Sequence, residues 1–169
     1  MTKVSLLLLT IIGLLANACS KDVAYPLTPV LSNPQFTIDK IAANDSTATQ
    51  TIVKLTCSFT DGDGDIGLTS ADTLPPNNVN FFIDYYEKID GAFSKVTAAN
   101  SITDTVNFNS RVPLLNSDGS KKSISGDISI DINVTASSSD TIAFQYYLVD
   151  RALNKSNSLN SGPIILSKK

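Results

Sequence analysis

The sequence of 169 residues contains no histidine and no tryptophan, only two cysteines, and Glu87 as the only glutamate among its sixteen acidic residues. Without histidine, nucleophilic catalysis by a Ser-His or Cys-His pair is excluded. Two cysteines cannot supply a cluster of thiolate ligands for a soft metal ion. Lysine and arginine form no basic cluster, so the electrostatic footprint of nucleic-acid binding is missing. These absences favour a protein that is not an enzyme and does not bind nucleic acid.

The first eighteen residues have the organisation of a cleaved export signal. Lys3 provides a positive charge, residues 4–15 are apolar, and Ala16-Asn17-Ala18 forms a small-residue cleavage region before Cys19. As a helix, an apolar segment of this length rises only about 18 Å, which is too short for roughly 30 Å of hydrocarbon. We therefore expect residues 1–18 to be a signal peptide and not a membrane span.

The end of this signal resembles a bacterial lipoprotein lipobox, whose cysteine is acylated and becomes the first residue of the mature chain. Leu15 stands four positions before Cys19, whereas the usual pattern has leucine three positions before. The resemblance implies lipidation at Cys19 and attachment to a membrane through that lipid. The alternative is an ordinary secretory signal that happens to precede a cysteine.

Ser20-Lys21-Asp22 is similar to the export signal that sends Bacteroidota lipoproteins to the outer face of the outer membrane. This similarity implies a lipid-anchored protein of the outer membrane, with the cell surface favoured over the periplasm. Three prolines then prevent a helix between residues 19 and 34, which we interpret as the lipidated cysteine and a Pro-rich tether. At up to about 3.3 Å per residue, residues 20–34 would hold the domain as far as roughly 50 Å from the lipid.

Residues 35–169 show apolar residues at alternate positions, in runs separated by turn residues, and no helical period. The chain therefore predicts an all-β domain, either an immunoglobulin-like or fibronectin-III-like sandwich of about seven strands or, as the alternative, a jelly roll. Cys57 falls on an apolar face and is expected to be a small core residue. The predicted strands are 36–41, 53–59, 79–89, 92–97, 106–115, 124–134, 141–150 and 158–166.

Three aspartates alternate in the Gly-rich segment from Asp61 to Gly67, directly after a predicted strand. This loop and residues 150–157 are connections that lie at the same end of an immunoglobulin-like sandwich. Carboxylate and amide oxygens are the ligands of Ca²⁺, which accepts six to eight of them. The spacing predicts a structural calcium site whose ligands are Asp61, Asp63, Asp65, Asp150 and Asn154.

Two other interpretations of this loop have different consequences. An EF-hand is excluded because Ile66 stands where that loop requires glycine and because strands, not helices, flank the loop. A plain turn is the remaining alternative, with the aspartates solvated or capping backbone amides. A packed cluster of carboxylates needs either a cation or an arginine, and Arg151 is the candidate arginine.

Residues 59–67, residues 150–157 and Tyr85-Tyr86-Glu87-Lys88 together resemble segments of small Bacteroidota envelope lipoproteins. The resemblance covers most of the mature chain and implies a sandwich domain on the cell envelope, without implying an activity. Leu153 stands where the resemblance leads us to expect glycine.

The function that these observations favour is that of a noncatalytic envelope lipoprotein, acting as a binding or adhesion module for a glycan or an envelope protein, or as an accessory subunit. A structural spacer is the alternative within the same class. A glycan-active enzyme with paired carboxylates is the less favoured alternative, because such a pair needs a cleft and a raised pKa. Phe82, Tyr86 and Tyr147 lie out of phase with the apolar faces, so they form either an exposed binding patch or contacts between neighbouring strands.

Overall fold

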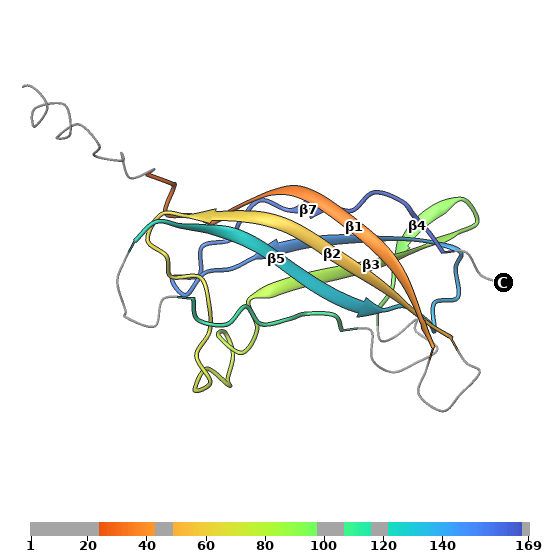
Figure 1. The fold of residues 1–169 in the computed structure, drawn as a ribbon, viewed down its shortest axis with the longest axis horizontal. Coiled ribbons are helices and arrows are strands. Elements are labelled where there is room, and N and C mark those ends of the chain that lie inside the picture. Colours follow the sequence, from red (N-terminus) through yellow and green to blue (C-terminus); the bar gives the residue numbers. More distant parts are fainter. Residues whose placement is uncertain (1–23, 43–48, 98–106, 116–121, 167–169) are drawn as a thin grey trace, which may run out of the picture.

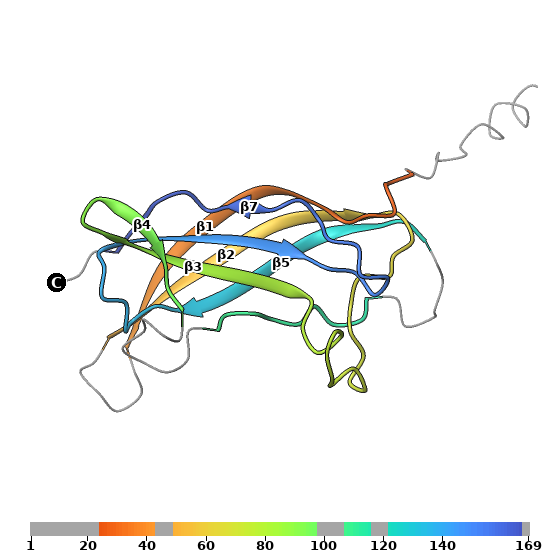
Figure 2. The same ribbon diagram turned by 180° about the vertical axis from the view of Figure 1, so that it is seen from behind.

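A computed structural model describes residues 24–42, 49–97, 107–115 and 122–166. Two antiparallel sheets pack face to face in this part of the chain, and none of its residues forms a helix (Figures 1 and 2). The expectation of an all-β sandwich is confirmed. The described residues accordingly contain no helix with the length and apolar character needed to cross a membrane.

The first sheet has the order β1-β2-β5 and the second the order β4-β3-β6-β7, with β8 also paired to β6. If the strands are lettered along the chain, A, B and E share one sheet while D, C, F and G share the other, which is an immunoglobulin-like arrangement in which strand D pairs with C and not with E. The strands are β1 Val30–Ala42, β2 Thr49–Asp61, β3 Phe81–Ile89, β4 Ala92–Lys95, β5 Ile124–Asn133, β6 Thr141–Leu148, β7 Leu159–Asn160 and β8 Ile164–Ile165.

The core lies between the sheets, where the predicted alternation of apolar residues directs one face of each long strand inward. Cys57 is 2% exposed within this core. Its burial, and secondarily the charge of Asp127, raise the pKa of the thiol to about 11, so Cys57 is a core residue as expected. The central core residues of β2 and β6 are Val53, Leu55, Cys57, Phe59, Ile142, Phe144, Tyr146 and Leu148.

The structure corrects the predicted boundary of the tether. Strand β1 begins at Val30, five residues before the expected start of the domain at residue 35, and Leu31 is already 2% exposed. Pro34 is accommodated because the pairing with β2 shifts register between Ser32 and Gln35. Proline in this stretch therefore marks an irregular edge strand, not a tether.

Two predicted strands are also corrected. Residues 107–115, the described part of the expected strand 106–115, form only isolated bridges, because Pro113 lacks the N–H that a ladder requires. The expected strand 158–166 is divided into β7 and β8 by Gly162, which has a φ of 70°, and Pro163. The predicted hairpin at Asp90-Gly91 is confirmed, since both residues have positive φ.

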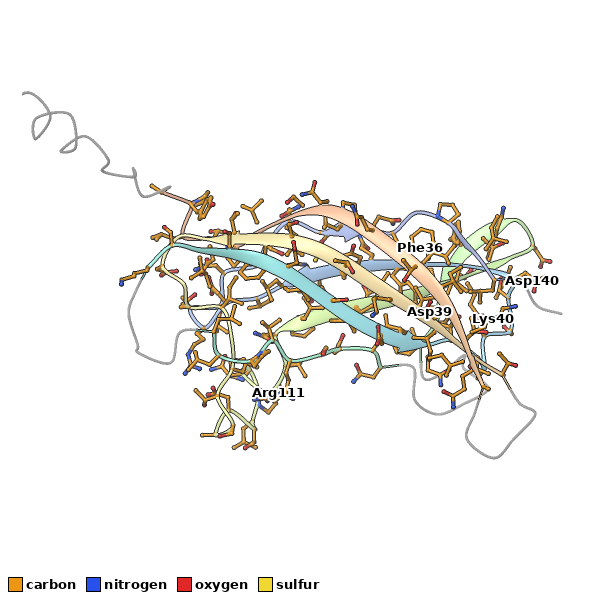
Figure 3. All side chains as sticks on the ribbon, viewed as in Figure 1. Phe36, Asp39, Lys40, Arg111 and Asp140 are labelled. Carbon is orange, nitrogen blue, oxygen red and sulfur yellow. The ribbon has the colours of Figure 1, made fainter. Side chains whose placement is uncertain are left out.

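The connection between β2 and β3 is fastened to residues 107–115 at two places. Gly67 has a φ of +117°, and a Cβ at this position would lie 2.5 Å from the carbonyl oxygen of Pro113. Beyond it, Arg111 donates hydrogen bonds to the backbone carbonyls of Thr69, Asp72 and Asn78. Figure 3 shows Arg111 directed into this loop. The loop that follows the aspartates is thus held against the body of the sandwich.

We expect Gly67→Ala to lower the free energy of unfolding by about 2 to 4 kcal/mol, because the methyl group meets backbone atoms and the conformation disfavours any side chain. Gly91→Ala is the matched control: it has positive φ but open space around it, and should cost only about 1 kcal/mol. Urea unfolding of both variants measures the difference. Equal losses would show that Gly67 is needed for its backbone conformation alone.

Glu87, the only glutamate, is the last inward-facing residue of β3 and lies at the end of the sandwich opposite to Asp61. Its carboxylate is 7% exposed. It accepts hydrogen bonds from the hydroxyl of Tyr85 at 2.8 Å, from the hydroxyl of Ser137 at 2.9 Å and from the amide of Ser138 at 3.0 Å. Burial alone would raise its pKa, but the donors, led by Ser138, outweigh burial and hold the pKa below its usual value.

A carboxylate with a lowered native pKa stabilises the fold above its unfolded pKa, about 4.3, and loses that contribution as the pH falls through the native pKa. We expect Glu87→Gln to lower the free energy of unfolding by about 1 to 3 kcal/mol at pH 7. The difference in the free energy of unfolding between Glu87→Gln and wild type should become smaller below about pH 4. Denaturant titrations from pH 7 to pH 3 measure it, with Asp90→Asn on the exposed hairpin as control. A gap that is constant with pH would contradict this role.

Candidate metal centre

Asp61 lies inside the protein because it continues the alternation of β2. Phe59 and Asp61 are two positions apart and face the same side of the sheet, so the strand that carries the core also carries this carboxylate inward. Asp61 has no exposed surface. Its Oδ2 accepts a hydrogen bond from the amide of Asp65 at 3.0 Å, while its Oδ1 has no hydrogen-bond partner among the described residues.

Asp150 approaches the same place from the opposite sheet. It continues the inward phase of β6 two residues after Leu148, and it is 2% exposed. The backbone amide and the side-chain amide of Asn154 donate to its two carboxylate oxygens, at 2.7 and 2.8 Å. Leu153, where glycine was expected, has a φ of 67°, so the turn keeps the backbone conformation that glycine favours.

The structure brings three of the predicted ligands together. One oxygen each from Asp61, Asp65 and Asp150 lies within 4.8 Å of the others. The two loops are also joined by their backbones: the amide of Arg151 donates to the carbonyl of Asp65 at 3.3 Å, and the amide of Ala152 donates to the Asp65 carboxylate at 3.2 Å. The predicted meeting of the two loops at one end of the sandwich is confirmed.

Two predicted ligands hold different positions. Asp63 is not part of this group of three, although its Oδ1 is buried and has no hydrogen-bond partner among the described residues. Asn154 turns its amide nitrogen, not its oxygen, toward Asp150, so here it positions a carboxylate. Asn157, in the same loop as Asn154, holds β1 by accepting from the Leu31 amide at 2.8 Å and donating to the Leu31 carbonyl at 2.9 Å.

Negative charge accumulates at this site. Burial, and then the charges of Asp63, Asp65 and Asp150, raise the pKa of Asp61 to about 6. Arg151, the candidate counter-charge, turns away: its guanidinium pairs with Asp72 at 2.7 Å. The Asp72 pKa falls to about 2 through hydrogen bonds from the hydroxyl and amide of Thr69 and then through Arg151. Neutralisation of the cluster by Arg151 is therefore not what the structure shows.

Glu87 and Asp61 provide a comparison within one chain, since both are buried carboxylates on inner faces. Four donor groups surround Glu87 and its pKa is lowered. Asp61 accepts one hydrogen bond, faces other carboxylates, and its pKa is raised. A buried carboxylate in the second situation is stabilised by a positive charge placed among its neighbours.

The donor set fits a hard divalent cation. All the converging atoms are carboxylate oxygens, which Ca²⁺ and Mg²⁺ prefer to the nitrogen and sulfur ligands of zinc or copper. All three oxygens lie within 4.8 Å of one another, which is within the span of the oxygens around a bound Ca²⁺, about twice the 2.3 to 2.6 Å ligand distance.

No protein-family model matches this chain, and neither a curated protein nor a solved structure is significantly similar to it. The assignment of the site therefore rests on the residues themselves. A signal in the sequence does identify the burial of the two aspartates: Asp61 is in phase with Val53 to Phe59, and Asp150 with Ile142 to Leu148.

A second feature lies on the outer face of the second sheet. Phe82 and Tyr147 stack with ring centroids 5.0 Å apart, and the Lys155 ammonium lies 3.7 Å from the centre of the Tyr147 ring. These two aromatic residues thus contact neighbouring strands, as one of the two interpretations predicted. Tyr86 lines a shallow groove of about 270 Å³, together with Phe93, Ala143, Gln145, Asn160, Gly162 and Pro163.

Leu153 provides a test of the local turn. Because its φ of 67° disfavours a side chain, we expect Leu153→Gly to raise the free energy of unfolding by about 0.5 to 1 kcal/mol. Leu74→Gly is the control, since Leu74 is also exposed but does not have positive φ. Denaturant midpoints measure both variants. A loss of stability at both positions would show that the Leu153 side chain contributes more than its backbone strain costs.

Proposed function

We propose that the protein is a noncatalytic, lipid-anchored module of the cell envelope whose two sheets are joined at one end by a bound calcium ion. One observation carries the calcium part of this proposal: Asp61 is completely buried beside Asp65 and Asp150, and one of its oxygens has no hydrogen-bond partner among the described residues. The neighbourhood supplies like charges where a buried carboxylate needs an opposite one.

A calcium ion at this position would be held by Asp61, Asp65 and Asp150, with Asp63 close enough in sequence to join after a small movement. Its role would be structural. Asp61 ends a strand of the first sheet and Asp150 follows a strand of the second, so a shared ion fixes the two layers relative to each other. The ion also removes the repulsion within the cluster.

The same geometry supports the absence of catalysis by paired carboxylates. The raised pKa of Asp61 is a feature that the acid of a glycosidase also needs. An acid catalyst must touch its substrate, however, and Asp61 has no exposed surface.

The binding role is supported by the difference between the two outer faces. The first sheet shows mainly short polar side chains outward, such as Thr56 and Ser129, which contact each other, and Ser58, which donates to Asp127. The second sheet has the aromatic residues and the groove at Tyr86 and Phe93. A glycan or an envelope protein would contact this second face. Membrane attachment, through Cys19 at the outer membrane and preferably at the cell surface, is supported by the N-terminal sequence.

Calcium binding can be tested with a variant whose melting temperature should be higher than that of wild type in EDTA but should not rise when Ca²⁺ is added. In millimolar Ca²⁺, at about 100 times the dissociation constant, wild type should gain about 2.7 kcal/mol, or roughly 5 to 10 °C, relative to EDTA. Asp61→Asn keeps the acceptor for the Asp65 amide but removes one buried charge. We expect it to melt higher than wild type in EDTA, by about 1 to 2 kcal/mol of stability, and to lose the response to calcium.

Asp39→Asn is the control, because Asp39 lies on β1 near the other end of the molecule (Figure 3). It should respond to Ca²⁺ like wild type. Coincident melting curves of wild type in EDTA and in Ca²⁺ would refute the calcium site. A calcium response retained in Asp61→Asn would place the ion elsewhere.

A further inference from the structure

The segment before β1 is packed against the candidate calcium site. A Cβ at Gly62 would lie 2.4 Å from the carbonyl oxygen of Tyr25 and 2.7 Å from that of Pro26. Pro29 is completely buried, and Leu31 is fastened through both backbone groups by Asn157. Residues 24–31 are therefore part of the folded body and not a spacer.

This packing shortens the connection to the lipid. Among the described residues, Tyr25 is the first with a contact to the loop of the candidate site, at Gly62, and it lies six positions after Cys19. Six residue-to-residue steps span at most about 22 Å, compared with the roughly 50 Å that a tether extending to residue 34 would allow. The chain enters the sandwich at the end where β2 finishes and β5 begins (Figure 1).

Two exposed leucines flank the Asp61 loop at this same end. Leu27 is 63% exposed and directly follows Pro26, whose carbonyl contacts Gly62. Leu153 is 54% exposed and directly follows Ala152, whose amide donates to Asp65. Exposed leucines close to a lipid surface are favourably placed to enter its headgroup region.

We infer that the Asp61 end of the sandwich faces the membrane that carries its anchor, within about 22 Å of the lipid surface, with Leu27 and Leu153 in contact with the headgroups. The inference rests on the proposed lipidation of Cys19. Calcium favours this arrangement, because two positive charges offset the aspartates that anionic headgroups would otherwise repel. Residues 89–92 and 134–140, at the opposite end, then point away from the membrane, farther by roughly 40 Å, the length of a thirteen-residue strand.

Energy transfer to a labelled lipid tests this orientation with the full acylated chain. The protein is reconstituted in vesicles of phosphatidylethanolamine and phosphatidylglycerol that contain a rhodamine lipid. A fluorophore is attached to Ala152→Cys in one sample and to Ala92→Cys, on the far hairpin, in another. Cys57 is buried and its pKa is raised, so it should not react with the label, and the chain without an added cysteine measures any background.

We expect transfer from position 152 to be several-fold greater than from position 92, and to increase further when Ca²⁺ replaces EDTA. Leu27→Ser combined with Leu153→Ser should lower transfer from position 152 at least twofold while leaving the calcium-dependent melting shift in place. Equal transfer from both positions, or greater transfer from 92, would overturn the orientation. Unchanged transfer in the double variant would overturn the contact of the leucines.

The same samples distinguish failure of this inference from failure of the proposed function. Flotation of the acylated chain with the vesicles, lost in Cys19→Ala, establishes the anchor. A chain that does not float would overturn the anchored role and, with it, the orientation. A chain that floats with equal transfer from both labels would overturn the orientation alone, and a missing melting shift would overturn only the calcium site.

Discussion

A buried carboxylate must be matched by donors or by positive charge, and this constraint governs both ends of the sandwich. Strand alternation carries three acids inward: Glu87 on β3, Asp61 on β2 and Asp150 directly after β6. At the Glu87 end, a turn rich in serine supplies the donors from within the chain. At the Asp61 end, the loops supply further aspartates, and no positive charge of the described residues matches the Asp61 carboxylate.

The contacts of Arg151 show why the Asp61 end of the sandwich stays negatively charged. Its backbone amide binds Asp65, which places the guanidinium within reach of the cluster, yet the side chain pairs with Asp72 and thereby stabilises the 68–80 loop. Arg111 holds the same loop through three carbonyls. Both arginines thus order the surroundings of the aspartates without neutralising Asp61, as expected for a site that a cation completes.

Alternation in the sequence was sufficient to predict the sandwich, because β2 and β3 bury every second residue and β5 and β6 turn alternate apolar residues inward, and it also predicted the meeting of the two acidic loops. It was insufficient where proline interrupts a run. Pro34 lies within a strand and Pro113 prevents one, and the difference depends on pairing partners far away in the chain. The orientation of the Asn154 amide and the partner of Arg151 also depend on tertiary contacts that spacing does not encode. The inward phase of Asp61 and Asp150 could have been predicted, since it continues the pattern of their strands.

Gly62 lies where the acidic site meets the segment through which the chain enters the sandwich. Its missing side chain allows the backbone of residues 25 and 26 to lie on the loop that carries Asp61, while Asn157, from the loop that carries Asp150, fastens Leu31. An ion that orders both loops would therefore also order the segment before β1. If that end is directed at the membrane, the faces left for a partner are the far loops and the aromatic face of the second sheet. Lys155 lies over Tyr147 at the part of that face nearest the acidic site, so the groove at Tyr86 and Phe93, farther from the membrane, is the more accessible contact surface.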